Sequence, residues 1–212
     1  MVSSGGRLFY IVDEGSEWLQ DCLPADWTLS ARDAFNGVVL WSRKIASWQP
    51  ANQKGRIPFA PDLFRRLVAV GDRVYVTLSI FGPVSVLNAA SGETLRTYSN
   101  TDKTEELIVD GGVLYCINSL ADPAAIDRRA MVFQRTPPAK KRLAAIRAET
   151  GETLWTKEDA DMESYLPLTL IAQGKRTLFQ NAQAIFCLDS ATGKLLWWHD
   201  QASLYAREAW ST

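Results

Sequence analysis

The sequence has few of the residues that build metal sites and disulfide frameworks. Its 212 residues include three cysteines and one histidine. Cys22, Cys116 and Cys187 lie far apart, form no Cys-x-x-Cys pair and are odd in number. Because zinc sites need closely spaced ligands and disulfide frameworks need even sets of cysteines, neither is expected here. The cysteines also give no indication of the cellular compartment.

Neither sign of charge is in excess. Lys and Arg number 23, against 24 Asp and Glu. A net charge near zero supplies no long-range attraction to a polyanion or to an anionic membrane surface. The basic stretch 123–142 is offset by acidic stretches at 100–110 and 158–163. We therefore expect no nucleic-acid partner.

Long apolar runs and a leader-like start are also missing. No apolar stretch approaches the ~18 residues that a membrane-spanning helix needs. The first residues, Met-Val-Ser-Ser-Gly-Gly, include neither a basic nor an apolar region, so they do not look like a signal peptide. We expect no membrane span and no leader in this sequence.

Apolar and aromatic residues are abundant. Hydrophobic residues make up 47% of the chain and charged residues 22%, and eight residues are Trp. Such a composition buries a substantial core instead of remaining disordered. A chain of this length fits one large β domain.

One short pattern occurs four times along the chain. Each copy has a polar or charged residue, two spacers, an Asn, Ser or Thr, and then Gly, and in three of the four copies a Trp lies four residues after the Gly. Repeats of this kind indicate successive copies of one structural unit. The copies are 33–41, 88–96, 147–155 and 189–197.

The spacing within each copy predicts a tight hairpin turn. A type I turn closed by a residue at positive φ needs glycine at its end, and the glycines here are Gly37, Gly92, Gly151 and Gly193. A side-chain oxygen at the first position can accept hydrogen bonds from the turn amides, and it is supplied by Asp33, Asn88 and Asp189. Arg147 cannot accept such a bond, so we expect the third turn to be the loosest.

Apolar segments of strand length surround these turns. They are too short for helices, are rich in β-branched and aromatic residues, and are separated by glycine-containing pairs. The clearest segments are 67–70, 74–78, 113–117, 168–171 and 184–188. The chain is therefore predicted to be all-β.

The repeats divide the chain into a partial β-propeller of about four four-stranded antiparallel blades. The expected blades cover about 7–45, 65–98, 105–157 and 165–199, with 200–212 as a tail or the start of a further strand. Only six residues precede Arg7, so the first blade is expected to lack its inner strand. Residues 203–206 are one candidate to supply that strand.

Long insertions are expected at one end of the blades. They occupy 14–27, 46–64, 120–141 and 157–164, which connect either the second to the third strand of a blade or one blade to the next. Insertions gathered on one face often form a binding surface; the alternative is solvated loops whose aromatic residues cover the blade ends. The candidate residues of this binding rim are Trp18, Trp27, Trp48, Arg56, Arg128, Arg129 and Arg135.

The four copies resemble the quinoprotein-type β-propeller repeat of pyrroloquinoline-quinone (PQQ) dehydrogenases and of the lipoprotein scaffold that assists outer-membrane protein assembly. Segments 32–41 and 184–197 are close to this repeat, whereas Arg96 replaces the Trp of the second copy. The resemblance implies a quinoprotein alcohol dehydrogenase-like propeller, with six to eight blades in a complete ring. It implies that Trp41, Trp155 and Trp197 dock between adjacent blades, and that the protein is extracytoplasmic, in the periplasm.

Such a repeat specifies fold more strongly than function. In the PQQ dehydrogenases of the family, an adjacent Cys-Cys disulfide and a Ca²⁺ site with Glu, Asn and a catalytic Asp serve the cofactor. Here no two cysteines are adjacent, and no acidic and amide residues cluster with Ca²⁺-loop spacing. His199 has no evident partner for acid–base catalysis. We predict no catalytic residue, no cofactor and no metal site, with PQQ and calcium as the alternative.

The sequence favours a non-catalytic propeller module that uses its rim to bind a protein or a small ligand. The alternative is a fragment of a PQQ-dependent dehydrogenase whose cofactor ligands lie outside this chain. Four blades do not close the usual ring, and open sheet edges are prone to aggregate. We therefore expect partners that complete the ring, either further blades of a longer protein or a second copy in a homodimer of eight blades.

Overall fold

The computed structural model describes residues 1–15, 26–46, 63–121 and 140–200, with only the backbone of Leu63 and Phe64. Within these ranges the chain is almost entirely β-strand. Two short 3-10 helices interrupt the described strands, η2 (Leu63–Arg66) and η4 (Ala160–Met162). The predicted all-β class is confirmed.

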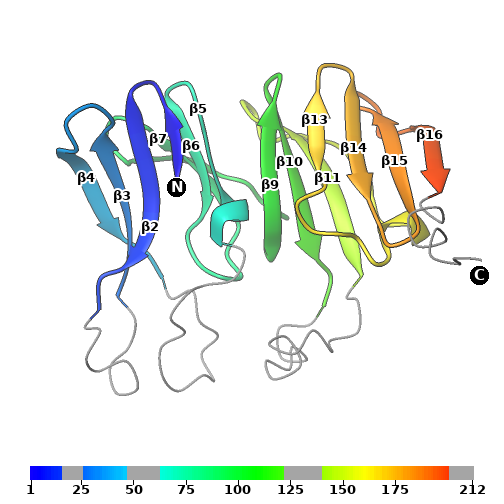
Figure 1. Cartoon of the computed structure of the whole chain (residues 1–212), viewed down its shortest axis with the longest axis horizontal. Coiled ribbons are helices and arrows are strands. Elements are labelled where there is room, and N and C mark those ends of the chain that lie inside the picture. The colour runs from blue at the N-terminus through cyan, green and yellow to red at the C-terminus, as the bar shows by residue number, and fades with distance from the viewer. Residues whose placement is uncertain (16–25, 47–62, 122–139, 201–212) are drawn as a thin grey trace, which may run out of the picture. The chain divides into compact units, whose positions relative to one another are not determined.

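The strands form four antiparallel sheets of four strands each, and in every sheet the strands follow the order of the chain (Figure 1). We call these sheets blades 1 to 4. Blade 1 consists of β1 (Val2–Ser4), β2 (Arg7–Asp13), β3 (Trp27–Asp33) and β4 (Val39–Lys44). Blade 2 consists of β5 (Leu67–Val70), β6 (Arg73–Thr77), β7 (Val84–Asn88) and β8 (Thr94–Thr97).

Blade 3 consists of β9 (Thr104–Asp110), β10 (Val113–Ser119), β11 (Lys141–Arg147) and β12 (Thr153–Lys157). Blade 4 consists of β13 (Ile171–Gln173), β14 (Arg176–Gln180), β15 (Ala184–Asp189) and β16 (Leu195–Asp200). The chain divides into two compact units, Met1–Leu107 and Ile108–Thr212, with the boundary inside β9. The repeated meander of four short strands is the blade of a β-propeller, as the repeats predict.

Blade 1 has an inner strand, contrary to the expectation that it would lack one. β1 pairs with β2 in the register Val2↔Phe9, Ser3↔Leu8 and Ser4↔Arg7. Gly5 and Gly6 have φ values of +56° and +72°, so these two residues alone reverse the chain, as hairpin turns with two positive φ values do. The six residues before Arg7 are therefore enough for a strand, and residues 203–206 lie outside the described part of the chain.

The four predicted hairpin turns share one hydrogen-bond pattern. In each, the glycine amide donates to the carbonyl of the residue four positions earlier, at 2.8 to 3.0 Å, as in Gly193 to Asp189. The register of the two strands then shifts beside the turn, which is the signature of a β-bulge. The extra residue increases the local twist of the outer strand pair.

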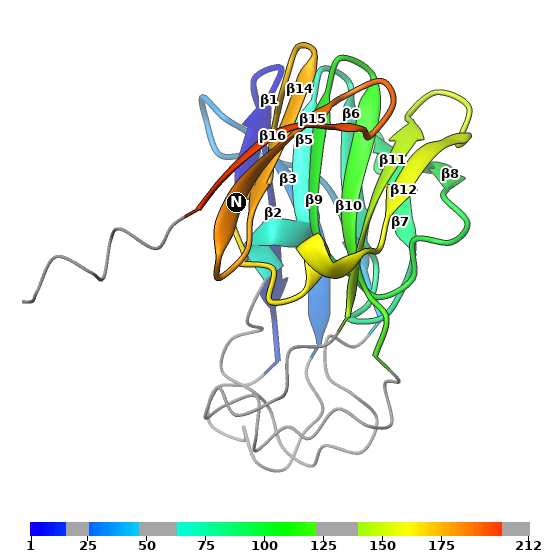
Figure 2. The same ribbon diagram turned by 90° about the vertical axis from the view of Figure 1, so that its right-hand side faces the viewer.

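A second set of bonds joins the two tight turns at one end of each blade. In blade 4 the amide of Ser190 donates to the carbonyl of Lys175 at 3.0 Å, and in blade 2 the amide of Ala89 donates to Asp72 at 2.8 Å. Figure 2 shows the turns from β13 to β14 and from β15 to β16 at the same end of blade 4. This end of every blade is therefore closed by short, cross-linked turns.

The core of the first unit lies where blade 1 meets blade 2. Phe9 and Leu29 of blade 1 and Val74, Val76 and Leu87 of blade 2 are all fully buried in one apolar cluster. Each large apolar side chain removed from water in this way stabilises the unit by about 1.5–3 kcal/mol. Packing of one sheet on the next therefore holds the two blades together.

The second unit repeats this arrangement between blade 3 and blade 4. Its cluster joins Ile117 and Leu143 of blade 3 to Phe179 and Phe186 of blade 4. The rings of Phe179 and Phe186 are stacked with their centroids 4.9 Å apart, within the range of favourable aromatic pairs. η4 contributes Met162, which is also buried in this cluster.

Candidate functional site

Trp41 of β4 lies against the tight turn of the neighbouring blade 2. Its indole Nε1 donates a hydrogen bond of 3.0 Å to the carbonyl oxygen of Ala89. A Cβ placed on Gly92 would lie 2.7 Å from Cε3 of the same indole. Arg43, two residues further along β4, donates to the carbonyl of Gly92 at 2.9 Å. The outer strand of blade 1 thus docks on the tight turn of blade 2.

Trp155 of β12 makes the same contact with blade 4 in the second unit. Its Nε1 donates to the carbonyl oxygen of Ser190 at 2.9 Å, and a Cβ on Gly193 would lie 2.6 Å from Cδ2 of the indole. Ser190 directly follows the first residue of its turn, as Ala89 does. Two separate blade pairs therefore use one docking geometry.

Two features of this contact explain why Gly92 and Gly193 are glycines. Gly92 and Gly193 have φ values of +74° and +69°, a region that costs other L-residues roughly 1–2 kcal/mol. They also provide the flat surface on which the indole lies, since no side chain fits beneath it. Gly174, with a φ of +62° and nothing within 4 Å of the position that a Cβ would take, meets only the first requirement.

The first turn residues accept hydrogen bonds where the sequence offers an acceptor. Oδ1 of Asp33 accepts from the amides of Phe35 and Asn36, and the side chains of Asn88 and Asp189 do the same in their own turns. In the third turn Arg147 instead pairs with Glu152 at 3.1 Å. The amide of Gly151 still bonds the carbonyl of Arg147 at 2.8 Å, so the greater looseness of this turn stays a prediction.

Trp197 differs from the other two indoles. The resemblance implied that Trp197 docks between adjacent blades. Trp197 is instead 43% exposed, because no described blade follows blade 4. Arg96, which replaces Trp in the second copy, is exposed as well. The expected docking of Trp197 is therefore not made within the described part of the chain.

The insertions leave the blades at the end opposite to the tight turns. In blade 1, Asp13 pairs with Trp27 and Thr28 pairs with Lys44, so the strand ends that flank 16–25 and 47–62 lie together. In blade 3, Ser119 pairs with Lys141 in the same way at the flanks of 122–139. Of the rim candidates, Trp18, Trp48, Arg56, Arg128, Arg129 and Arg135 lie outside the described residues.

Trp27 is the one rim candidate that the structure describes, and it is 5% exposed. Its Nε1 is buried and has no hydrogen-bond partner among the described residues. Trp27 therefore packs beneath the rim and does not present its ring on the described surface.

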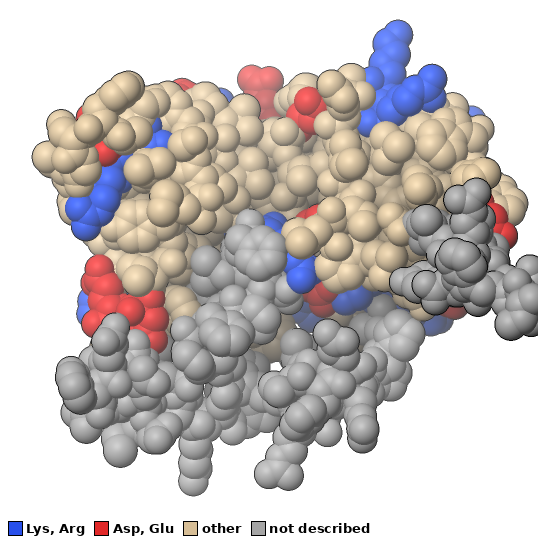
Figure 3. All heavy atoms as spheres, in the orientation of Figure 1, with Lys and Arg blue, Asp and Glu red and all other residues tan. Residues whose placement is uncertain are grey.

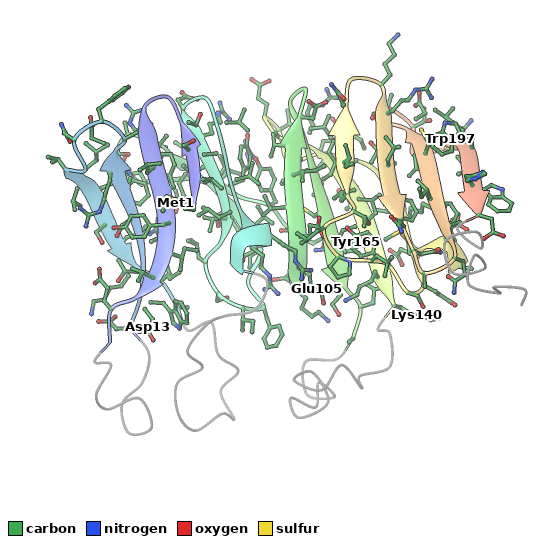
Figure 4. All side chains as sticks on the ribbon, viewed as in Figure 1. Met1, Asp13, Glu105, Lys140, Tyr165 and Trp197 are labelled. Atoms are coloured by element: carbon green, nitrogen blue, oxygen red, sulfur yellow. The ribbon has the colours of Figure 1, made fainter. Side chains whose placement is uncertain are left out.

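Polar groups around Trp27 tie the ends of the first insertion together. Oδ1 of Asp13 accepts from the amides of Gly15 at 3.0 Å and Asp26 at 2.8 Å, and the amide of Glu14 donates to the carbonyl of Asp26 at 2.9 Å. Figure 4 shows Asp13 at the end of β2, and Figure 3 shows acidic side chains gathered at this end of blade 1. The residues that flank the insertion, Asp13 to Gly15 and Asp26, form its stem. The carboxylate of Asp13 thus holds the two sides of this stem together.

Lys44 completes this group at the end of β4. Its Nζ lies 2.8 Å from Oδ2 of Asp26. The hydrogen bond and the charge of Asp26 raise the pKa of the Lys44 ammonium. The pair is largely exposed, so it contributes little to the stability of the unit.

In the second unit, a charged group lies at the end of blade 3 from which the insertion leaves. The sequence did not predict this group. Nζ of Lys157 lies 2.7 Å from Oδ2 of Asp159 and 2.6 Å from Oδ2 of Asp161. Burial opposes the charge of Lys157, but hydrogen bonds to both carboxylates outweigh it and raise the pKa of the ammonium. The spacing Lys157-x-Asp159-x-Asp161 could have indicated the group, since η4 turns these side chains toward one another.

The model of one protein family matches residues 25–208, which is most of the chain. That family is described as outer membrane protein assembly factor BamB. The chain belongs to the BamB family. Among curated proteins, none matches the sequence.

Solved structures similar to this BamB-family chain are quinoprotein dehydrogenases. A europium-containing methanol dehydrogenase aligns over 92% of this chain and 40% of its own, with a TM-score of 0.53 and 12% identity. A quinohemoprotein alcohol dehydrogenase from Comamonas testosteroni aligns over 84% and 32%, with a TM-score of 0.46 and 15% identity. The chain thus spans less than half the length of these structures, and at such identities the likeness shows the fold alone.

The described residues of this BamB-family chain supply no ligand set for a metal ion. Within residues 1–15, 26–46, 63–121 and 140–200, no three His, Cys, Asp or Glu side chains lie close enough to hold one. Cys116 and Cys187 are fully buried inside β10 and β15 and are not in a disulfide, and Cys22 lies outside the described residues. His199 is exposed on β16. The described residues therefore do not match the adjacent-cysteine disulfide and the Ca²⁺ ligand set of the PQQ dehydrogenases.

No helix in the described part of the chain is long and apolar enough to cross a membrane.

Proposed function

We propose that this chain is a non-catalytic β-propeller module that binds a protein partner through the loop-bearing end of its blades. The family description, an assembly factor for outer membrane proteins, supports a protein as the partner. A small ligand bound at the same end is the narrower variant of this proposal. Further blades or a second copy of the chain would occupy different surfaces.

The stem of the first insertion is the observation that carries the proposal. Asp13 holds both ends of residues 16–25 through the amides of Gly15 and Asp26. A loop whose ends are fixed loses less conformational entropy when it is ordered by a partner. Binding loops on a rigid scaffold have this construction. The tight turns at the other end are much shorter, as between β1 and β2.

The charge of the described stem favours a partner with basic groups. Asp13, Glu14 and Asp26 lie at this end of blade 1, and Lys44 is the cation that pairs with Asp26. Complementary charge at the edge of an interface raises the association rate and makes it depend on salt. Binding through this end should therefore weaken as the ionic strength rises.

Affinity capture with matched variants tests this proposal. The chain is immobilised and exposed to a cell-envelope extract, and retained proteins are quantified by mass spectrometry. Trp18→Ala, Trp48→Ala and Asp13→Ala should each lose the same retained protein. Phe35→Ala changes an aromatic residue that is 91% exposed at the tight-turn end and should retain it. Equal retention by all four variants would refute binding through the loop-bearing end.

The alternative is a fragment of a PQQ-dependent dehydrogenase whose cofactor ligands lie outside this chain. PQQ added to the chain in the presence of Ca²⁺ would quench tryptophan fluorescence in a saturable way if the chain contributed to such a site. Turnover of an alcohol under these conditions, with capture of proteins unaffected by the Trp18 and Trp48 changes, would favour the alternative. Absence of saturable quenching at micromolar PQQ would remove its support.

A further inference from the structure

The outer strand of blade 4 differs from the outer strands of the other blades in its charge. The fourth strand of every blade forms an edge of its sheet. An open edge can pair with a strand of another protein, and proteins commonly block such edges with Lys or Arg side chains. β4 and β8 carry the exposed Lys44 and Arg96, and β12 carries Lys157. β16, Leu195–Asp200, contains no Lys and no Arg.

One position of β16 also differs from its counterparts. The residue five positions after the turn glycine is Ser42, Thr97 and Thr156 in blades 1 to 3, and Trp198 in blade 4. In blades 1 and 2 the hydroxyl at this position forms a hydrogen bond of 3.0 Å with a hydroxyl of the neighbouring strand. Trp198 is 59% exposed. A large apolar side chain thus replaces a small polar one at the edge of blade 4.

Trp198 and Trp197 point to opposite faces of blade 4, because side chains alternate along a strand. The residue four positions after the glycine faces the next blade, as Trp41 and Trp155 show. Trp198 therefore faces the side of blade 3, whose strands β10 to β12 lie in the same unit. The edge of β16 lies in the plane of its own sheet and faces neither neighbour. A further blade after blade 4 would cover Trp197 and leave this edge and Trp198 open.

Trp198 is the last member of an aromatic row that crosses blade 4. Phe179 of β14 lies opposite Phe186 of β15, and Phe186 lies opposite Trp198. The exposed fraction rises along this row from 1% to 6% and then to 59%, because no described strand lies beyond β16 in the sheet. A strand added beside β16 would continue the row and cover the indole, since opposite side chains of adjacent strands pack on one another.

The edge beside Trp198 is regular enough to pair with another strand. The bulge of the outer hairpin falls between Cys187 and Leu188, and beyond it Trp197 to Asp200 pair residue by residue with β15. A regular edge offers its outward N–H and C=O groups with the spacing of a β-ladder. The edge therefore suits an extended peptide backbone with an apolar or aromatic side chain opposite Trp198.

We propose that the edge of β16 binds an extended segment of the protein partner by strand addition. Four paired strand residues are too few to hold a homodimer together, since stable interfaces bury about 1,200–2,000 Å². They suffice as a second contact for a partner already held elsewhere on the chain, because linked contacts strengthen one another. In assigning the segment to that partner, the inference rests on the proposed function.

A short synthetic peptide that alternates valine and threonine between terminal lysines tests the inference on the full chain. Calorimetric titration should show saturable binding, and hydrogen exchange should slow in β16 but not in β4 or β8. Trp198→Thr, which introduces the residue type found at Thr97 and Thr156, should weaken binding at least about tenfold. Trp198→Lys should weaken it further, because it places a cation on the edge. Circular dichroism establishes that each variant is folded.

Two controls separate strand addition from general adhesion of an apolar peptide. Leu95→Lys places the same cation on β8, at a residue that is 52% exposed, and should leave peptide binding unchanged. Methylation of one alternate set of the peptide's backbone amides should abolish binding, whereas methylation of the other set should not, because an added strand pairs with β16 along one edge only.

Three results would overturn the inference. They are absence of saturable binding up to about 1 mM peptide, equally tight binding by the parent peptide and both methylated forms, and a dimer of the free chain that Trp198→Thr dissociates, since a second copy would then occupy the edge. The peptide does not involve the insertions, so Trp18→Ala and Trp48→Ala should bind it normally while they lose the captured partner. Failure of the proposed function and failure of this inference are therefore distinguishable.

Discussion

Nε1 of Trp155 lies 2.9 Å from the carbonyl oxygen of Ser190, and the same indole covers Gly193 three residues further along the turn. The pair joins the outer strand of blade 3 to the outer hairpin of blade 4. In the first unit, Nε1 of Trp41 forms the same hydrogen bond, 3.0 Å long, with the carbonyl oxygen of Ala89. A short sequence pattern therefore encodes both a turn within one blade and the contact that joins two blades.

The first prediction concerns the surface under the indole. Gly193→Ala should lower the free energy of unfolding by about 2–4 kcal/mol, because a positive φ strains alanine and the added methyl group meets Trp155. Gly174 is at a turn of the same blade with open space around it. Gly174→Ala should therefore lower the free energy of unfolding only by the strain of a positive φ, about 1–2 kcal/mol. Urea unfolding followed by circular dichroism measures both. Equal losses would show that the indole does not press on Gly193.

The second prediction concerns the indole hydrogen bond. Trp155→Phe should keep most of the ring packing but lose the donor, which leaves the buried carbonyl of Ser190 unpaired at a cost of about 1–3 kcal/mol. Trp198→Phe, on an exposed residue of β16, should change the free energy of unfolding by less than about 0.5 kcal/mol. Chemical denaturation of the two variants gives the comparison. A loss at Trp198 as large as at Trp155 would contradict the assignment.

The third prediction uses the departure of the third copy from the pattern. Arg147→Asp should stabilise the chain by about 1 kcal/mol, because a carboxylate at this position accepts hydrogen bonds from the turn amides. The exposed pair with Glu152 that is lost contributes little. Arg147→Ala removes the same pair without adding an acceptor and serves as the control. No difference in unfolding midpoint between Asp and Ala would count against the role assigned to the first turn residue.

The fourth prediction is a pH dependence at the fourth turn. Hydrogen bonds from the hydroxyl of Thr192 and from the amides of Thr192 and Ala191 lower the pKa of Asp189 below its usual value of 3.8. The stability that this carboxylate contributes is present above pH 3.8 and is lost as the pH falls through its lower pKa in the folded protein.

Asp189→Asn keeps the side-chain acceptor but does not titrate, and Asn88 already occupies the equivalent position in blade 2. Thermal unfolding should therefore show a smaller decrease in melting temperature for Asp189→Asn than for the wild type as the pH is lowered below 3.8. An identical pH profile for the two proteins would show that the carboxylate of Asp189 is not linked to folding.

Much of the fold was predictable because its signals are local. Asp33 and Gly37 specify a turn through their own side chain and backbone, and the apolar segments beside them specify strands. The inner strand of blade 1 was missed because three residues, Val2–Ser4, are too few to show an alternating pattern. Its one available signal was the Gly5-Gly6 pair, which closes a hairpin with no additional residue.

The candidate sites depended on contacts that sequence spacing does not reveal. Ala89 lies 48 residues from Trp41, so its role as acceptor emerges only from the packing of two blades. Trp27 was expected on the rim as an aromatic of an insertion, yet its place at the start of β3 buries it. Trp197 has the same pattern as Trp155 but lacks a described next blade, and a pattern within one hairpin carries no information about the neighbouring blade.

A double-mutant cycle between Trp155 and Gly193 tests the docking account most directly. The free energies of urea unfolding are measured for the wild type, Trp155→Ala, Gly193→Ala and the double variant. Docking predicts that the methyl group costs less once the indole is removed, with a coupling energy of about 1–2 kcal/mol between the two sites. Strict additivity of the two losses would contradict the claim that this tryptophan and this glycine join neighbouring blades.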